Sequence, residues 1–225
     1  LPAGSARLWY RRKDEPYYCG EPAMTAIPKL MADGLEIRSA TRVAGIDAGA
    51  KGWRLALDGE EKSITASSLL LTPPVPQMLE LLSTIRERLD PEILDLLRSI
   101  SYAPSLALLL LLEGSSPVPE PGYHRPPRSQ TIYWIADNVK KGISPEEEGA
   151  AITIHATPGY SRRRYDDGEE EITEELLSAF RELYEGGGGS SWAARGTQLK
   201  EWRYARPTNP PPERSYLLSA DAKLP

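Results

Sequence analysis

The side chains best suited to chemistry stand at every second position of two expected strands. Successive side chains of a strand point to opposite faces, so in residues 152–157 one face carries Thr153, His155 and Thr157 and the other carries Ile152, Ile154 and Ala156. In residues 200–206, one face carries Lys200, Trp202, Tyr204 and Arg206. A polar or aromatic face on a sheet half covered by helices indicates a cavity wall. We therefore take Thr153, His155, Trp202 and Tyr204 as substrate-cavity candidates.

An alternative interpretation remains open for this face. His155 is then a hydrogen-bonded sheet histidine and Trp202 a core residue. In the cavity interpretation, His155 is the side chain of that face whose charge changes near neutral pH. The second histidine, His124, lies in a Pro-rich stretch that predicts a surface loop.

Several other kinds of site are excluded by what the sequence contains. The sequence lacks a Gly-x-Ser-x-Gly elbow, so it predicts no nucleophile of that kind. It contains one cysteine (Cys19) and two histidines, so it predicts neither a disulfide nor a metal site. Gly45, Gly49 and Gly52 are spaced as turn residues, not as a phosphate loop. A reduced thiol and the lack of a signal segment lead us to expect a cytoplasmic protein.

Charge and hydropathy exclude two classes of partner. The net charge is −5 and the sequence pI about 5.3, and Lys and Arg do not gather into one basic face. Nucleic acid is therefore not expected as a partner. The longest apolar run, Leu106 to Leu112, has seven residues, whereas a membrane span needs about 20. It predicts a buried strand, and a small molecule is the expected partner.

Hydrophobic periodicity predicts helices and strands in alternation. The expected helices are residues 23–33, a stripe beginning at Val75, a segment begun by Asp90-Pro91, and residues 169–185, which Asp167 could cap. The expected strands are 35–37, 41–46, a hairpin over 52–66 turning at Asp58-Gly59, a fully buried strand over 68–72, and later strands over 102–113, 131–137, 150–157, 198–206 and 215–218. Gly186 to Ser191 predicts a flexible insert. The fold class is α+β.

Ordered sequence pieces carry a family resemblance. The first runs from Gly20, Pro22, Met24 and Pro28-Lys29-Leu30 through Thr41-Arg42-Val43 to Leu69-Leu70-Leu71-Thr72-Pro73-Pro74; later pieces are Tyr102-Ala103-Pro104-Ser105-Leu106, His155-Ala156-Thr157-Pro158-Gly159 and Trp202-Arg203-Tyr204-Ala205. In this order they resemble the FAD-dependent amine oxidase-like oxidoreductases, closest to the renalase-like branch. The resemblance implies part of a Rossmann-like FAD-binding domain with a β-meander, followed by an antiparallel substrate-domain sheet backed by helices.

The resemblance also implies domain limits and cofactor contacts. Residues 1–75 would belong to the FAD-binding domain, 76–206 to the substrate domain, and 207–225 would return to the first. The main-chain N–H and C=O of Val43 would meet the adenine edge, with Arg42, Thr72 and Pro73 also beside FAD. From the residues alone, Thr41-Arg42-Val43 is equally well an ordinary strand with β-branched residues. Because the family's phosphate-binding loop is absent from the sequence, we expect an internal fragment that is inactive by itself.

Two functions are compatible with these observations. The first is an FAD-dependent oxidoreductase that takes a hydride equivalent from an amine or a reduced nicotinamide-type substrate. Flavin then supplies the electron acceptor, so the protein needs neither a nucleophile nor a metal. The alternative is a non-catalytic α+β binding module, or a remnant that has lost flavin.

Overall fold

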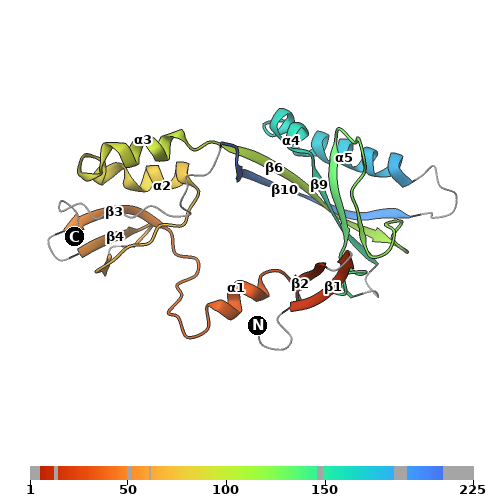
Figure 1. Cartoon of the computed structure of the whole chain (residues 1–225), viewed down its shortest axis with the longest axis horizontal. Helices are drawn as coiled ribbons and strands as arrows, with labels where there is room; N and C mark the ends of the chain where they lie inside the picture. Colours follow the sequence, from red (N-terminus) through yellow and green to blue (C-terminus); the bar gives the residue numbers. More distant parts are fainter. Residues whose placement is uncertain are drawn as a thin grey trace. The chain divides into compact units, whose positions relative to one another are not determined.

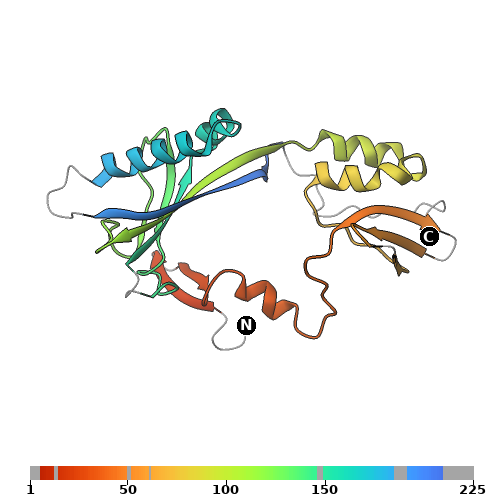
Figure 2. The same ribbon diagram turned by 180° about the vertical axis from the view of Figure 1, so that it is seen from behind.

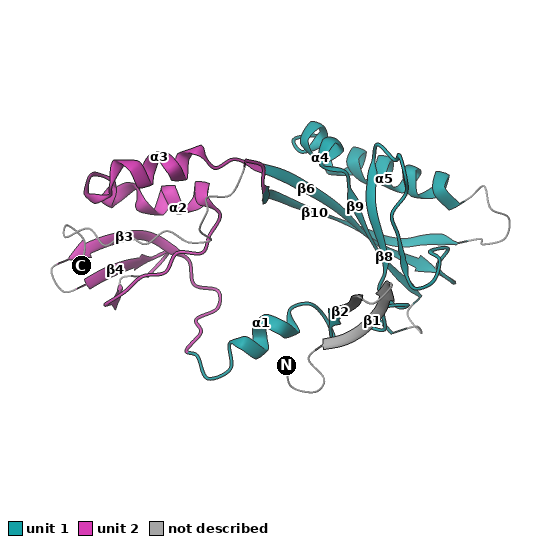
Figure 3. Ribbon diagram, viewed as in Figure 1, with its two compact units in different colours: residues 1–35, 103–206 teal, residues 36–102, 207–225 magenta. Residues whose placement is uncertain are grey.

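A computed structural model describes residues 6–12, 15–49, 52–60, 62–145, 149–184 and 192–209, the side chains from residue 18 onward. The chain forms two compact units (Figure 3): unit 1 contains residues 1–35 and 103–206, and unit 2 contains residues 36–102 and 207–225. The expected boundary after residue 75 instead falls inside unit 2. The reason is packing: the segment after residue 75 shares a core with the strands before it, and Cys19 contacts Lys141.

Unit 1 is built on a five-stranded sheet in the order β10-β6-β9-β8-β7. The strands are β6 (Tyr102–Glu113), β7 (Tyr123–His124), β8 (Ile132–Asp137), β9 (Ala150–Ala156) and β10 (Ala193–Pro207). The pairs β6–β9, β9–β8 and β8–β7 are antiparallel. The fold is therefore α+β, and the four expected strands that fall in unit 1's described residues all form.

Two helices cover one face of this sheet (Figures 1 and 2), α4 (Pro158–Arg164) and α5 (Glu169–Tyr184). The helices bury every second side chain of β9: residues 150, 152, 154 and 156 are buried, and the residues between them are half-buried. Ile172, Leu176 and Phe180 of α5 pack into the same core as alternate leucines of β6. The expected helix over 169–185 is confirmed, whereas α4 was not expected.

The N-terminal part of unit 1 is a hairpin followed by a short helix. Strands β1 (Ala6–Arg12) and β2 (Glu15–Gly20) pair antiparallel, and α1 spans Ala26–Met31. The hairpin lies on the side of the sheet away from α5 (Figures 1 and 2). The helix lies inside the expected range 23–33, and Gly34 follows it with a φ of 78°, a conformation that favours glycine after a helix end.

Unit 2 packs helices on a three-stranded sheet in the order β3-β4-β5. The strands are β3 (Val43–Gly49), β4 (Gly52–Leu57) and β5 (Ile64–Ala66), and the helices are α2 (Val75–Leu81), a 3-10 turn over Leu82–Arg88 and α3 (Pro91–Ser99). The expected turn at Asp58-Gly59 forms, with a φ of 73° at Gly59. Asp90 caps α3 by accepting a hydrogen bond from the backbone N–H of Glu92 at 2.9 Å.

Two expected strands before α2 are wrong. Residues 35–37 and 68–72 pair with no strand among the described residues. Leu69 and Leu71 pack against the core of unit 2, but Leu70 is 84% exposed, so the run is apolar without being enclosed. A continuous apolar run becomes a buried strand only where sheet partners flank it. The Gly186–Ser191 insert and the strand at 215–218 lie outside the described residues.

None of the helices in the described part of the chain combines the length and the apolar character needed to cross a bilayer.

Candidate functional site

The sheet of unit 1 has one face that α4 and α5 leave uncovered, here named the open face. Strand register shows which side chains share it: His155 of β9 lies opposite Ala107 of β6 and Trp134 of β8, and Thr153 lies opposite Leu109 and Ala136. Directly opposed residues of an antiparallel pair point to the same side. Thr153 and His155 are both half-buried, as expected of a wall that solvent partly reaches.

Strand β10 presents Trp202 and Tyr204 to this same face. Leu199 is buried in the core beneath the helices, and Arg203 pairs with Asp166 and lies over the ring of Tyr165, both just after α4. Residues 199 and 203 thus point to the helices, so residues 202 and 204 point the other way. Trp202 is 48% exposed, which contradicts the interpretation of it as a core residue.

His155 sits in a setting that favours the neutral imidazole. Burial is the larger cause that lowers its pKa, and the positive charge of Lys141 lowers it further. Burial also lowers the pKa of Lys141 itself, which follows β8 and whose carbonyl oxygen faces the Cys19 thiol at 3.9 Å. His155 can therefore accept a hydrogen bond or a proton at neutral pH.

Thr153 is held by a neighbour on the turn after β8. The side-chain amide of Asn138 donates to its hydroxyl oxygen at 3.1 Å. The backbone N–H of Asn138 donates to the carbonyl of Ala151 at 2.8 Å, so the turn is fixed to β9 at two points. The hydroxyl hydrogen of Thr153 is left to donate elsewhere.

Sequence reasoning missed an aromatic pair on the open face. The rings of Tyr123 and Trp134 stack with centroids 4.8 Å apart and planes 11° apart. Trp134 lies opposite His155, and Tyr123 lies opposite Ala136, so both belong to the open face. The sequence pattern did not place Trp134 on this face because the register shifts between Ile132 and Trp134, which breaks simple alternation along β8. Tyr123 stands in a Pro-rich stretch that predicted only a loop.

The four candidates for cofactor contact lie in unit 2, whereas the substrate candidates lie in unit 1. Val43 begins β3, which is an edge strand of its sheet. The N–H of Asp58 donates to the carbonyl of Arg42 at 2.9 Å. The next pair along the two strands is Val43 opposite Leu57. Hydrogen-bonded and non-hydrogen-bonded pairs alternate along an antiparallel ladder, so the N–H and the C=O of Val43 point away from β4. That geometry fits a main-chain contact with a nucleotide edge.

Thr72 and Pro73 occupy the extended segment before α2. Thr72 is exposed and Pro73 half-exposed. Behind them, the N–H of Val75 donates to the hydroxyl of Tyr102 at 3.3 Å. This contact fixes the end of the segment, and the side chain of Thr72 is exposed.

No family model matches the sequence. Similar solved structures include one described as "Putative protoporphyrinogen oxidase from Exiguobacterium sp. 255-15" (TM-score 0.64, 18% identity, covering 88% of this chain and 42% of that one). An oxidoreductase from Methanosarcina mazei matches with a TM-score of 0.58 at 15% identity, covering 84% of this chain and 44% of that one. A CLA-producing fatty acid isomerase from P. acnes matches with a TM-score of 0.53 at 13% identity, covering 80% and 39%.

These likenesses establish the fold. The chain spans less than half the length of the structures it matches. The neighbours carry names from two reaction classes, oxidation and isomerisation, and one fold commonly hosts several activities. Function must therefore be argued from the site.

Proposed function

We propose that this chain supplies the substrate wall and part of the adenine side of an FAD-dependent, amine oxidase-like oxidoreductase of the renalase-like type. The observation that carries the proposal is the open face: four side chains chosen from the sequence and an additional aromatic stack share the face that α4 and α5 leave uncovered. The fold likeness to proteins named as oxidases or oxidoreductases supports the same reaction class. The substrate is an amine or a reduced nicotinamide-type compound.

The residues of the open face would bind and orient the substrate. Trp202 and the Tyr123–Trp134 stack offer flat apolar surface to a planar or aliphatic substrate. Neutral His155 would accept the proton that an ammonium group must lose before its carbon can give up a hydride. Thr153, fixed by Asn138, would hold the substrate's polar end. The electron acceptor would be FAD, which takes up the hydride.

On the cofactor side, the peptide groups of Val43 would bind the adenine edge. This contact needs only the backbone, so the side chain of Val43 is free to pack in the core of unit 2. Arg42, Thr72 and Pro73 would flank the nucleotide. We expect Val43→Ala to leave FAD binding near normal. Val43→Pro should weaken it, because proline removes the donor N–H.

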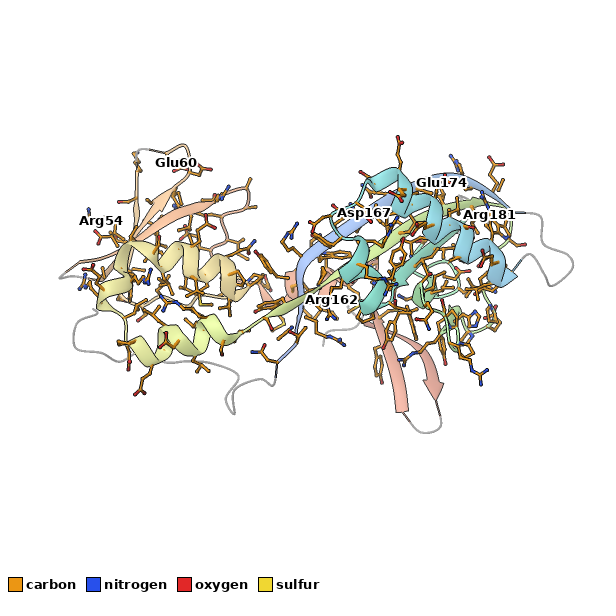
Figure 4. All side chains as sticks on the ribbon, turned by 90° about the horizontal axis from the view of Figure 1, so that it is seen from above. Arg54, Glu60, Arg162, Asp167, Glu174 and Arg181 are labelled. Atoms are coloured by element: carbon orange, nitrogen blue, oxygen red, sulfur yellow. The ribbon has the colours of Figure 1, made fainter. Side chains whose placement is uncertain are left out.

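Flavin reduction in the FAD-loaded protein tests the substrate wall. His155→Ala should slow anaerobic reduction by substrate at least about ten-fold, at the low end of what a positioned proton acceptor contributes. Tyr204→Phe should slow it to a smaller degree. Bound FAD per protein should stay near normal in both variants, and the exposed Arg162 on α4 (Figure 4) offers a matched control, Arg162→Gln. Unchanged reduction rates in both variants would remove the open face from the active site.

A non-catalytic module is the competing proposal, favoured by one observation: these 225 residues contain no Gly-x-Gly-x-x-Gly. Pyrophosphate binding at a helix N-terminus normally needs that loop. The coding sequence on either side decides between the two. A Gly-x-Gly-x-x-Gly upstream, after a strand and before a helix, supports the enzyme, and its absence supports the module.

A further inference from the structure

The loop before β8 forms a cleft that is lined by none of the four substrate-cavity candidates. Its volume is about 400 Å³, and it is lined by residues 125–129 together with Ile132, Tyr133 and Thr157. Two of the lining side chains, Arg125 and Arg128, are cationic, and both are exposed. The cleft thus combines positive charge with the exposed apolar surfaces of Pro127 and the Tyr133 ring.

The two arginines of the cleft differ from the paired arginines elsewhere in the protein. Arg38, Arg98, Arg164 and Arg203 each pair with a carboxylate. Within the described part of the chain, no carboxylate pairs with Arg125 or Arg128. In a protein of net charge −5, two neighbouring guanidinium groups without acidic partners have their hydrogen-bond donors available to an anion.

A ring contact positions Arg125 at the cleft, and the backbone of Arg128 has an unusual conformation there. The guanidinium of Arg125 lies over the Tyr133 ring, 4.4 Å from its centroid. Arg128 has a φ of 68°, a left-handed conformation that residues other than glycine rarely adopt. Residues held in such conformations gather at ligand-binding sites, where the surrounding structure maintains the strain.

The cleft adjoins the open face. Thr157, which lines it, follows His155 by two residues along the same extended stretch, so about 7 Å separates them at the rise of a strand. Tyr133, which also lines the cleft, directly precedes Trp134 of the aromatic stack. The cleft and the open face thus meet along neighbouring residues of β8 and of the stretch after β9.

We propose that this cleft binds the oxyanion group, a carboxylate or a phosphate, of a small aromatic molecule. Guanidinium groups bind both anions through paired N–H donors, and the exposed side chains of Pro127 and Tyr133 offer apolar surface to the aromatic body. The inference rests on the proposed function only in identifying this molecule as the substrate. Anion binding by the cleft itself requires no flavin.

The test measures binding to the 225-residue protein without cofactor. Phenyl phosphate, benzoate and uncharged benzyl alcohol are titrated into ¹⁵N-labelled protein and followed by amide chemical shifts. At least one of the two anions should bind saturably, with shifts centred on residues 125–133 and 157, and should bind more weakly as salt is raised. Benzyl alcohol should bind at least about ten-fold more weakly, since a hydrogen bond to a charged group is worth about that factor.

Variants locate the binding. Arg125→Gln and Arg128→Gln should each weaken the anion at least about ten-fold, while Arg162→Gln, which removes an exposed arginine outside the cleft, should not. Should Arg128→Gln fail to fold, Arg128→Gly removes the same charge and suits the left-handed backbone. A preference for phenyl phosphate identifies a phosphate ligand, and a preference for benzoate a carboxylate.

Three results would overturn the proposal: no saturable anion binding, equal binding of benzyl alcohol, or equal weakening by Arg162→Gln. Because flavin takes no part, these results are independent of the reduction kinetics that test the proposed function. A normal anion titration with unaltered reduction in the His155 variant would leave the cleft in place and remove only the catalytic proposal.

Discussion

Arg203 holds its guanidinium over the ring of Tyr165, 4.5 Å from the ring centroid, and donates to Asp166 at 2.9 Å. Together with the buried Leu199, these contacts show which way the side chains of β10 point. They keep Arg203 on the helix side of the sheet, and by alternation they turn Trp202 and Tyr204 to the open face. The composition of the candidate cavity thus depends on a contact made on the opposite side of the sheet.

The two faces of β10 should respond differently to truncation. Leu199 is 8% exposed and packs in the core, so Leu199→Ala should lower the free energy of unfolding by about 2–5 kcal/mol. Trp202→Ala should cost less than about 1 kcal/mol, because nearly half of that side chain is already exposed. Urea denaturation of both variants decides this, and equal losses would mean that Trp202 is a core residue after all.

Alternation along β9 could be predicted because one face is fully apolar. Ile152, Ile154 and Ala156 are buried, as their pattern indicates. The start of α3 at Asp90-Pro91 could also be predicted, because the capping hydrogen bond and the proline restraint involve only neighbouring residues. Short-range patterns therefore predicted β6, β8, β9 and β10 of unit 1's sheet, but not β7, and they predicted the strand positions of Thr153 and His155.

Long-range partners could not be predicted from such patterns. Ser68 to Thr72 has the composition of an enclosed strand, but no strand pairs with it among the described residues. Thr157 was taken as the end of a strand, whereas its hydroxyl accepts from the N–H of Tyr160 and begins α4. The Thr-Pro pair was an available sign of that helix start. The sequence did not indicate a site at Tyr123 or Arg125, because the pairing of β7 with β8 that positions them was not predicted.

Protonation of His155 should make the protein less stable in mild acid. Its pKa in the folded protein lies below the ordinary 6.5 because of burial and then Lys141. Between the lowered folded pKa and about 6.5, the unfolded chain binds a proton that the folded protein does not. The free energy of unfolding should therefore fall as pH drops from 7 through this window and level off below the folded pKa.

Urea titrations at pH 7.5, 6.5 and 5.5 check this, with His155→Gln expected to show a smaller pH dependence. His124, whose Nδ1 lies 2.7 Å from the hydroxyl of Tyr184, also has a pKa lowered by burial. His124→Gln should therefore reduce the slope as well. An unchanged slope in His155→Gln would show that the imidazole is already solvated.

The hydroxyl of Tyr160 should contribute measurably to stability. It is buried and donates to Glu175 at 2.7 Å, and burial followed by this carboxylate raises the pKa of Tyr160. Tyr160→Phe should lower the free energy of unfolding by about 1 kcal/mol, with Glu175 still paired to Arg164. Tyr18→Phe, at an exposed tyrosine, is the matched control and should change nothing in guanidinium denaturation.

Two glycines with similar backbone conformations should differ in their tolerance of alanine. Gly34 and Gly149 have φ values of 78° and 91°, so alanine is strained at both. A Cβ at Gly34 would meet nothing within 4 Å, whereas at Gly149 it would collide with the carbonyl oxygen of Leu112 on β6. Gly34→Ala should cost about 1 kcal/mol, and Gly149→Ala more than about 2 kcal/mol, because the backbone at the paired ends of β6 and β9 must move as well. Thermal unfolding of the pair distinguishes strain from collision, and equal midpoints would show that β6 and β9 separate here without cost.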